Sequence, residues 1–446
     1  MDVTGKKVLV VGLGKTGIAA VRLLACRGAR IVAVDEKPFD CLSEAQSRLR
    51  DVEWSLGTYG PESLEGVSLV VPSPGVPPAD RILREAVSRG VSVLSEMEIA
   101  FRLLKPPVVA ITGTNGKTTV TTLIGNILKK AGKKVFVGGN IGAPLAGYVV
   151  GPQGDDYAVI EVSSFQLQWI ERFHPRIAVH LNTTCDHVDY HGSFEEYRRV
   201  KDRIFANQEA GDLAILNADE PWPEERFRPV RATIRRFSSS RIVTDGMYLD
   251  AKDMILAVPG APEERYPRSL VRIPGVHNLE NVMAAILACR ACGCPPEAAA
   301  RAVEEFPGIS HRIEHTATKN GVAFYDDSKG TNVDAVRRAL QTFDKPIILL
   351  LGGRDKEGDF ETLASLVRER VKRLVLFGEA RDRIEERLGG IVPTEKIPSL
   401  GPAIEAAYSR AAAGDIVLLS PGCASFDEFA NYKERGNFFK EVVRRL

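Results

Sequence analysis

The chain has 446 residues, and its 59 Lys and Arg residues against 58 Asp and Glu give a formal net charge of +1. At ~150 residues per domain, this length predicts about three domains. The near-neutral charge argues against recruitment of nucleic acid or an anionic membrane by a strong field, so any nucleotide has to be held locally. Apolar runs fall short of the ~18 residues of a membrane span, and seven scattered cysteines form no secreted disulfide framework; both features predict a cytoplasmic protein.

The first block, residues 1–105, opens with KKVLVVGLGKTG, which predicts a strand, a turn with the complete pattern G-x-G-x-x-G and a helix. The glycines of that pattern are Gly12, Gly14 and Gly17. A second strand ends at Asp35, an acid of the kind that contacts a ribose in such folds. Taken alone, this block predicts a dinucleotide site. A later strand ends in the turn Ser73-Pro74-Gly75.

The second block, residues 106–306, follows the linker-like pair Pro106-Pro107 and opens with an apolar strand that runs into TGTNGKTT. Gly113 and Gly116 let backbone N–H groups converge on a phosphate, Lys117 adds a positive charge, and the Thr118 hydroxyl is placed to bind Mg²⁺. The match to the Walker pattern is incomplete, because Ile111 stands where its first glycine belongs. The strand before and the helix after supply the required context, so we predict a nucleoside triphosphate site.

Three apolar strands with polar ends follow, as expected of a sheet covered on both faces. Glu161 ends one of them, where an acid beside a phosphate loop commonly orients Mg²⁺. His187 lies in a loop and Lys201 on the amphipathic helix after it, so three candidate groups gather near one phosphate. The pattern alone leaves plainer interpretations open: a loop histidine satisfied by its neighbours, and a lysine on a solvated helix face. A cationic lysine beside a metal is repulsive.

Cys289, Cys292 and Cys294 lie close enough in sequence to suggest a metal site, but no second cluster matches them, so packing or a helix-end role is favoured. In the third block, residues 307–446, four strands each lead into a Gly- or Asp-rich loop, and such strand ends carry ligands in open α/β sheets. The chain is therefore predicted to be an α/β protein with three sheet-containing domains.

Eight motifs occur in order along the chain: ITGTNGKTT, EVSSFQL, LNTTCDHVDYHGSFEEYRRVK, GVHNLEN, SHRIE, DDSKGTN, LLGGRDK and LLSPGCASFDEFANYKERGNFF. Through them the chain resembles the Mur ligase family over essentially its whole length, and most of all the members that add D-glutamate. The resemblance implies a Rossmann-like N-terminal domain for a UDP group, a central P-loop ATPase-type domain and a Rossmann-like C-terminal domain that brings the amino acid. It also replaces the dinucleotide interpretation of the first glycine pattern.

The reaction implied by the resemblance has two steps. ATP phosphorylates the terminal carboxylate of UDP-N-acetylmuramoyl-L-alanine, and the amine of D-glutamate then displaces phosphate from the acyl phosphate, in peptidoglycan precursor synthesis. Both steps gather negative charge among phosphates, which suits two Mg²⁺ ions. The resemblance implies that Thr118 and Glu161 hold one ion, and that His187, Glu161 and Lys201 hold the other. It further implies a CO₂-derived carbamate on Lys201, which turns a repelling cation into an anionic ligand.

The resemblance implies further roles in groups. Catalysis falls to Lys117, Glu161, His187, Lys201 and Arg312. The UDP substrate is assigned to Gly14, Lys15, Thr16, Asp35, Glu36, Lys37, Ser73, Pro74, Gly75, Asn140, Ser163 and Gln166. ATP is assigned to Gly113, Thr114, Asn115, Gly116, Lys117, Thr118, Thr119, Asn278, Asn281, Arg312 and Asp327. D-Glutamate is assigned to Thr331, Lys356, Ser425, Phe426 and Tyr432. Lys15 departs from the apolar residue expected there. Without the resemblance, Phe426 and Tyr432 are typical of helix packing.

Other classes remain open at this point. A dehydrogenase explains the first glycine pattern but leaves the phosphate loop unused, and a P-loop regulatory or motor ATPase does not explain the third block. Within the family, L-alanine-adding ligases typically carry DDYxHHP where this chain has DDSKGT, and diaminopimelate- or lysine-adding ligases differ in the acceptor motif. Folylpolyglutamate synthases place the phosphate loop near the N-terminus, whereas about a hundred residues precede it here. We expect a monomer that binds small molecules, and neither nucleic acid nor membrane.

Overall fold

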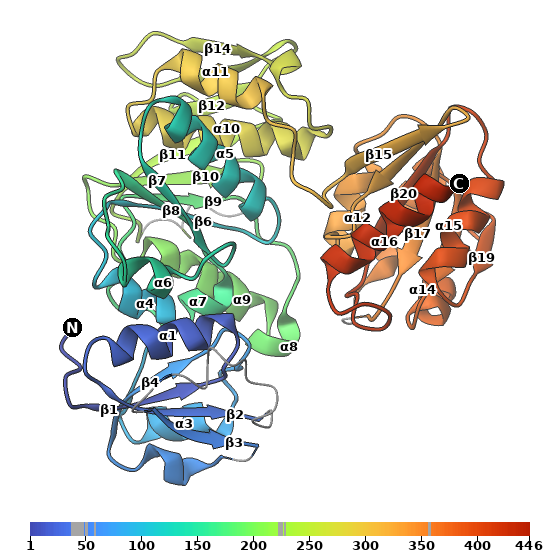
Figure 1. Ribbon diagram of the computed structural model, residues 1–446. Helices are drawn as coiled ribbons and strands as arrows, with labels where there is room; N and C mark the ends of the chain where they lie inside the picture. Colours follow the sequence, from blue (N-terminus) through green and yellow to red (C-terminus); the bar gives the residue numbers. More distant parts are fainter. Residues whose placement is uncertain (37–48, 50–51, 58, 222–225, 227–228, 356–357) are drawn as a thin grey trace. The chain divides into compact units, whose positions relative to one another are not determined.

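The computed structural model describes residues 1–36, 49, 52–57, 59–221, 226, 229–355 and 358–446. They form two compact units, residues 1–268 with 281–303 and residues 269–280 with 304–446. Two sheets lie in the first unit and one in the second, which confirms the predicted α/β class (Figure 1). The domain boundaries at 105/106 and 306/307 stay predictions. In the described part of the chain, no helix is both long and apolar enough to cross a membrane.

The first sheet has five parallel strands in the order β3-β2-β1-β4-β5. Successive residues of β1 face opposite layers: Val8 and Val10 pack in one core with α1, whereas Leu9 and Val11 pack in another with α3. Burial on both faces explains the unbroken apolar run of this strand. The elements are β1 (Lys7–Val11), α1 (Lys15–Ala25), β2 (Arg30–Asp35), β3 (Val52–Leu56), β4 (Val67–Pro72), α3 (Arg81–Ser88), β5 (Ser92–Val93) and α4 (Glu96–Phe101).

The second sheet has nine strands in the order β14-β13-β12-β11-β10-β9-β6-β8-β7, antiparallel only at β13 and β14. The strand before the phosphate loop, β6, lies between β8 and β9 and is buried throughout. The strands are β6 (Val108–Thr112), β7 (Val135–Gly139), β8 (Tyr157–Glu161), β9 (Ile177–His180), β10 (Leu213–Asn217), β11 (Thr233–Ser238), β12 (Gly246–Leu249), β13 (Asp253–Ala257) and β14 (Glu264–Pro267). The helices are α5 (Lys117–Lys130), α6 (Leu145–Val149), α7 (Ser164–Leu167), α8 (Val188–His191), α9 (Phe194–Asp202), α10 (Val276–Ala291) and α11 (Pro296–Glu304).

One core runs through both sheets of the first unit. Apolar side chains of β1, α1 and α4 belong to the same buried cluster as those of α6, β6 and β8. The loop after β1 and the loop after β6 are therefore attached to one packed body, although the length of the chain predicts separate cores.

The third sheet has the order β15-β16-β20-β17-β18-β19, with β15 antiparallel. Alternate residues of β17 enter opposite cores: Ile347, Leu349 and Leu351 join α12, α13 and α14, whereas Ile348 and Leu350 join α15 and α16. The elements are β15 (Glu314–Lys319), β16 (Val322–Asp326), α12 (Val333–Leu340), β17 (Ile347–Gly352), α13 (Ala364–Arg370), β18 (Val371–Phe377), α14 (Arg381–Leu388), β19 (Thr394–Lys396), α15 (Leu400–Ser409), β20 (Ile416–Gly422) and α16 (Tyr432–Arg445).

Candidate active site

The phosphate loop connects β6 to α5, as the sequence predicts. Gly116 caps α5 with a φ of 88°, and a Cβ there would lie 2.4 Å from Oδ1 of Asn281, so a larger residue would meet both backbone strain and a side chain. Lys117 crosses the loop and donates from Nζ to the carbonyls of Gly113 at 2.7 Å and Thr114 at 2.8 Å. The positive end of α5 and the Lys117 ammonium thus lie at the same loop, and together they form an anion-binding site.

The segment after β9 holds the phosphate loop in shape. Asn182 accepts a hydrogen bond from the backbone N–H of Asn115 on Oδ1 at 2.9 Å and donates from Nδ2 to the Asn115 carbonyl at 3.1 Å. The Thr114 hydroxyl lies 3.1 Å from that of Tyr197. Neither Asn182 nor Tyr197 is among the predicted site residues. The sequence feature that could have indicated Asn182 is the polar segment LNTT, which follows β9, the strand next to β6.

Two oxygen donors meet at the start of α5. The Thr118 hydroxyl donates to Oε2 of Glu161 at 2.8 Å, and Nδ2 of Asn140 donates to Oε1 of the same carboxylate at 2.9 Å. Glu161 ends β8 and is 2% exposed. The predicted pair Thr118 and Glu161 is therefore brought together, and a buried carboxylate with a hydroxyl is a donor set that Mg²⁺ accepts.

Lys201 is only 1% exposed, so its interpretation as a solvated lysine is wrong. Its Nζ donates to the carbonyl of Gly113 at 2.9 Å and lies 4.6 Å from the ring centre of Tyr197. Burial, and then the charge of Lys117, lower the pKa of Lys201 well below its usual value. Because Lys117 also contacts the Gly113 carbonyl, two lysines meet at the base of the phosphate loop.

His187 has a left-handed backbone, with a φ of 55°, and lies directly before α8. Its ring is 4.8 Å from that of Phe165 and 6.1 Å from that of Tyr197, centre to centre. Both His187 and Lys201 therefore flank Tyr197. A positive φ in a non-glycine residue is uncommon and is concentrated at functional sites.

The first glycine loop is built differently. A Cβ at Gly17 would lie 1.9 Å from the carbonyl oxygen of Gly12, so only glycine fits. Asp35 accepts a hydrogen bond from the N–H of Leu13 at 2.5 Å, and the Ser73 hydroxyl donates to the Gly12 carbonyl at 2.6 Å. The predicted residues Asp35 and Ser73 thus bracket this loop. Gly14 caps α1 and Thr16 lies in its first turn, Glu36 follows β2, and Pro74 and Gly75 follow β4.

Lys15 points away from its own loop, and its Nζ donates to the carbonyl of Gly142 in the second sheet's Asn140 loop. Ser163 and Gln166 form a capping box at the start of α7, directly after β8. Their mutual hydrogen bonds fix the segment beside Glu161.

In the second unit, the predicted ATP residues Arg312 and Asp327 lie near the carboxyl end of β16, and Asn278 is held through Nδ2 by the Pro274 carbonyl at 2.6 Å. Asp327 is buried, which raises the pKa of its carboxyl to about 7, and it accepts a hydrogen bond from Ser420 at 2.7 Å. Thr331 follows the same strand, and Ser425 follows β20.

Phe426 is 60% exposed, so helix packing is the wrong interpretation for it. Tyr432 begins α16, and its hydroxyl accepts a hydrogen bond from Lys329 Nζ at 3.3 Å. Arg435 is buried and was missed: it donates to the carbonyls of Ser328, Cys423 and Ala424 and to the Ser328 hydroxyl. Its partners are backbone carbonyls and a hydroxyl, so no pairing with an acidic residue could indicate its role from the sequence. Lys37 and Lys356, predicted for the UDP substrate and D-glutamate, lie outside the described residues.

The three cysteines are buried, and the N–H of Cys294 donates to the Cys289 carbonyl at 3.1 Å, which closes α10. Their helix-end role is confirmed. Within the described ranges, the His, Cys, Asp and Glu ligand atoms that come together in a group of three are those of His311, Glu314 and Asp326.

Three domains of known proteins match the chain in order. Residues 6–95 match the MurD-like N-terminal domain of Mur ligases, residues 111–289 the Mur ligase middle domain, and residues 311–423 the glutamate ligase domain of Mur ligases. The chain belongs to the Mur ligase family. A relative from Syntrophus aciditrophicus (strain SB), named UDP-N-acetylmuramoylalanine–D-glutamate ligase, is 58% identical over 100% of this chain and 99% of its own length. A protein of the same name from Geotalea daltonii is 44% identical over the same shares.

Solved structures of other ligases share the fold of this Mur ligase. A pseudomurein peptide ligase type C from Methanothermus fervidus has a TM-score of 0.63 at 17% identity and covers 99% of this chain and 100% of its own. The MurF ligase from Thermotoga maritima in complex with ADP has a TM-score of 0.62 at 16% identity, with 100% and 97% covered. The three-domain α/β architecture implied by the sequence motifs is thereby confirmed.

Proposed function

We propose that this Mur ligase joins D-glutamate to UDP-N-acetylmuramoyl-L-alanine through an acyl phosphate, with release of ADP and phosphate. The observation that carries the proposal is the phosphate loop with Lys117 across it and the Thr118–Glu161 pair at its end, in a chain 58% identical to a relative of that name. ATP, Mg²⁺ and small-molecule substrates follow from it. We also propose that the protein works as a monomer in the cytoplasm.

Positioning and charge are the main contributions of the chain to such a reaction. The N–H groups at the start of α5 and the Lys117 ammonium bind the phosphates of ATP, and Asn281 beside Gly116 borders the same place. Thr118 and Glu161 would hold Mg²⁺, which neutralises phosphate charge when bound. The second ion would fall to Glu161, His187 and Lys201.

For Lys201 we propose a carbamate. Carbamate formation needs a neutral amine: its lone pair attacks the carbon of CO₂, an N–C bond forms as one C–O π bond breaks and leaves its electrons on oxygen, and the N–H proton passes to solvent. Burial and the nearby Lys117 lower the pKa of Lys201 and so favour the neutral amine that this step requires. The product is an anion that offers oxygen donors beside Glu161, and the repulsion between Lys201 and Lys117 becomes an attraction.

The decisive experiment measures phosphate release with UDP-N-acetylmuramoyl-L-alanine, ATP and Mg²⁺ against a panel of D- and L-amino acids. We expect turnover with D-glutamate and little with L-alanine, L-lysine or L-glutamate. Equal turnover with L-alanine would move the assignment to another ligase of the family. Binding of NAD without binding of a uridine nucleotide would instead favour the dehydrogenase interpretation of the first glycine loop.

A further inference from the structure

The turn at residues 310–313 of the second unit has an unusual backbone. His311 and Ile313 both have positive φ angles, 67° and 45°, and they flank Arg312 on both sides. L side chains avoid this region, and a β-branched residue such as isoleucine avoids it most strongly. Two such residues in a row of three persist only where their surroundings impose the conformation.

Three contacts fix this turn from the side of the sheet. Nδ1 of His311 lies 2.7 Å from Oδ2 of Asp326, and the N–H of Ile313 donates to Asp327 at 3.3 Å. The His311 carbonyl accepts from the N–H of Lys329 at 3.1 Å. The helix α16 packs directly against His311 and Asp326, because a Cβ at Gly436 would lie 2.2 Å from His311 Nδ1.

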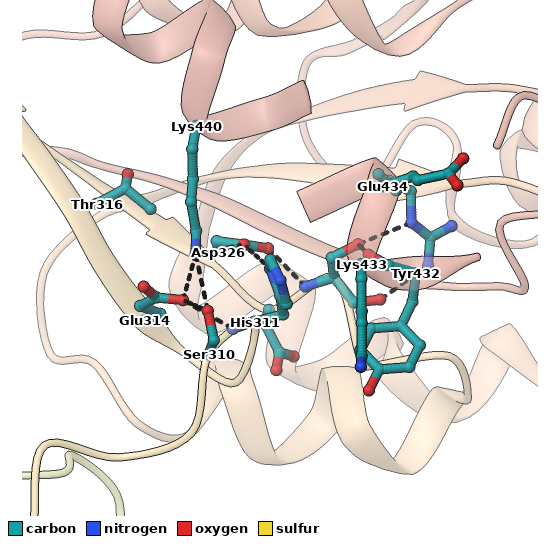
Figure 2. A network of polar contacts seen from close by, with 12 residues as sticks. Ser310, His311, Glu314, Thr316, Asp326, Tyr432, Lys433, Glu434 and Lys440 are labelled. Carbon is teal, nitrogen blue, oxygen red and sulfur yellow. Dashed lines mark hydrogen bonds and ion pairs between the residues drawn. The ribbon is translucent and has the colours of Figure 1, made fainter. Parts of the chain in front are cut away.

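A second group of contacts comes from Lys440, one turn further along α16 (Figure 2). Its Nζ donates to Oε2 of Glu314 at 2.6 Å and to the Ser310 hydroxyl at 2.9 Å. The same Glu314 oxygen accepts from the N–H of His311 at 2.7 Å and from the Ser310 hydroxyl at 2.8 Å. Lys440 also lies 3.8 Å from Asp326. One ammonium therefore neutralises the carboxylate that closes the strained turn.

We infer that Lys440, acting through Glu314 and Ser310, is a positioning residue for Arg312, because it holds the turn in the left-handed conformation that sets the direction of the Arg312 side chain. The inference rests on the proposed function and on the role in ATP binding that the resemblance to Mur ligases implies for Arg312. Without Lys440, Glu314 loses its charged partner, and the two strained residues on either side of Arg312 can relax toward ordinary backbone angles.

The kinetic test replaces Lys440 by methionine, which keeps the length of the side chain and removes its charge. Loss of part of a charge-assisted contact at Arg312 should raise KM for ATP roughly 5- to 30-fold, with KM for D-glutamate and the UDP substrate within about twofold. Lys440→Arg, which keeps the positive charge, should avoid most of this rise in KM for ATP. Lys433→Met is the matched control, because Lys433 is an exposed lysine on the same helix. An unchanged KM for ATP in Lys440→Met would overturn the inference.

A double-mutant cycle separates a positioning role from general damage. If Lys440 acts through Arg312, Lys440→Met should change KM for ATP by less than about twofold in an Arg312→Met background. Equal effects in both backgrounds would show that Lys440 acts elsewhere, and would refute the inference while leaving the proposed function standing. An Arg312→Met enzyme with unchanged KM for ATP would overturn the role of Arg312 and the inference with it.

A readout independent of ligase activity is amide hydrogen exchange. The N–H of His311 is bonded to Glu314, so its exchange should speed up at least about tenfold in Lys440→Met and more in Glu314→Gln, but stay unchanged in Lys433→Met. Equal protection in wild type and Lys440→Met would refute the positioning role, whatever the enzyme catalyses. Failure of ligation by wild type, with the exchange result as expected, would instead refute the proposed function.

Discussion

Two glycine-rich loops of the first unit share one local design, a buried parallel strand that leads through glycines into a helix, but they differ in the charges around them. In the loop before α1, the backbone N–H of Leu13 donates a hydrogen bond to the carboxylate of Asp35. The loop before α5 has two lysines on its backbone, Lys117 and Lys201, which share the Gly113 carbonyl. The backbone pattern is common to both, and the side-chain charge is opposite.

This difference separates binding from chemistry. Helix N-termini attract phosphates in both places. Among the described residues, the second loop has two lysines at its base and a buried acid with a hydroxyl, Glu161 and Thr118, which suit phosphoryl transfer. We therefore propose that the first loop binds the substrate and that the second carries out the transfer, and the predictions below test that division.

The largest effect is expected at Lys117. Lys117→Met removes the charge that lies across the phosphate loop, and kcat should fall about 10³-fold, the upper end for loss of one preorganised electrostatic group. Phosphate release measures it. Lys129→Met is the control, because Lys129 is exposed in the last turn of the same helix; it should remain within about twofold of wild type. If both variants keep full activity, the second loop is not the site of transfer.

Lys201→Met should lower kcat about 10²-fold, because a carbamate ligand can no longer form. The fold should survive, since methionine fills a buried position with a side chain of similar length, and Lys117 still donates to the Gly113 carbonyl. Carbon NMR with ¹³CO₂ should show a carbamate signal in wild type that is missing in the variant. A fully active wild-type enzyme without that signal would contradict the modification.

Particular residues show how far the sequence alone leads. The strand–loop–helix units, the Thr118–Glu161 pair and the loop positions of Asp35 and Ser73 could be predicted, because each is fixed by local backbone geometry or by a strand end. The burial of Lys201 could not, since the sequence of an amphipathic helix does not reveal which of its faces packs on the phosphate loop. Asn182 and Arg435 bind backbone carbonyls or amides of distant loops; the strand end LNTT hints at Asn182, but nothing in the sequence names its partner or that of Arg435. The strain at His311 and Ile313 is equally invisible, because no glycine marks it.

Glu96 begins α4, in the stretch of chain between β5 and β6, and the ionisation of its side chain should affect the stability of the fold. Its buried carboxyl accepts one hydrogen bond, from the N–H of Ala146 at 2.5 Å, and burial raises its pKa from 4.5 to about 7. The folded state thus holds this proton more tightly than the unfolded state, so stability falls as pH rises from 4.5 to about 7 and stays low above it. Glu96→Gln should remove this loss, worth up to about 3 kcal/mol at alkaline pH.

Thermal unfolding of wild type and Glu96→Gln across this pH range measures the effect. The two curves should converge in acid, where the glutamic acid is neutral, and diverge in alkali with the variant more stable. Parallel curves would show that the carboxylate is solvated, and that the core shared by the two loops is looser than its apolar packing indicates.

Asp35→Asn tests the first loop. The substitution weakens a charge-assisted bond to Leu13 that fixes the loop, so KM for the UDP substrate should rise about tenfold, whereas KM for ATP should stay within about twofold. Steady-state kinetics with each substrate varied in turn distinguishes the two. A larger change for ATP than for the UDP substrate would reverse the assignment of the two loops.

The smallest effect is expected at Lys15, the lysine that occupies the first loop. Unlike Lys117, it is exposed and donates to the carbonyl of Gly142, not to its own loop. Loss of one exposed contact is worth about 0.5–1 kcal/mol, so Lys15→Met should raise KM for the UDP substrate only about two- to fivefold and leave kcat unchanged. If kcat falls as far as in Lys117→Met, the two loops are chemically alike and the charges on their backbones do not divide binding from transfer. A small effect confined to KM would support that division. Lys15 and Lys117 both lie next to a helix N-terminus, so their different effects would follow from the groups that their side chains contact.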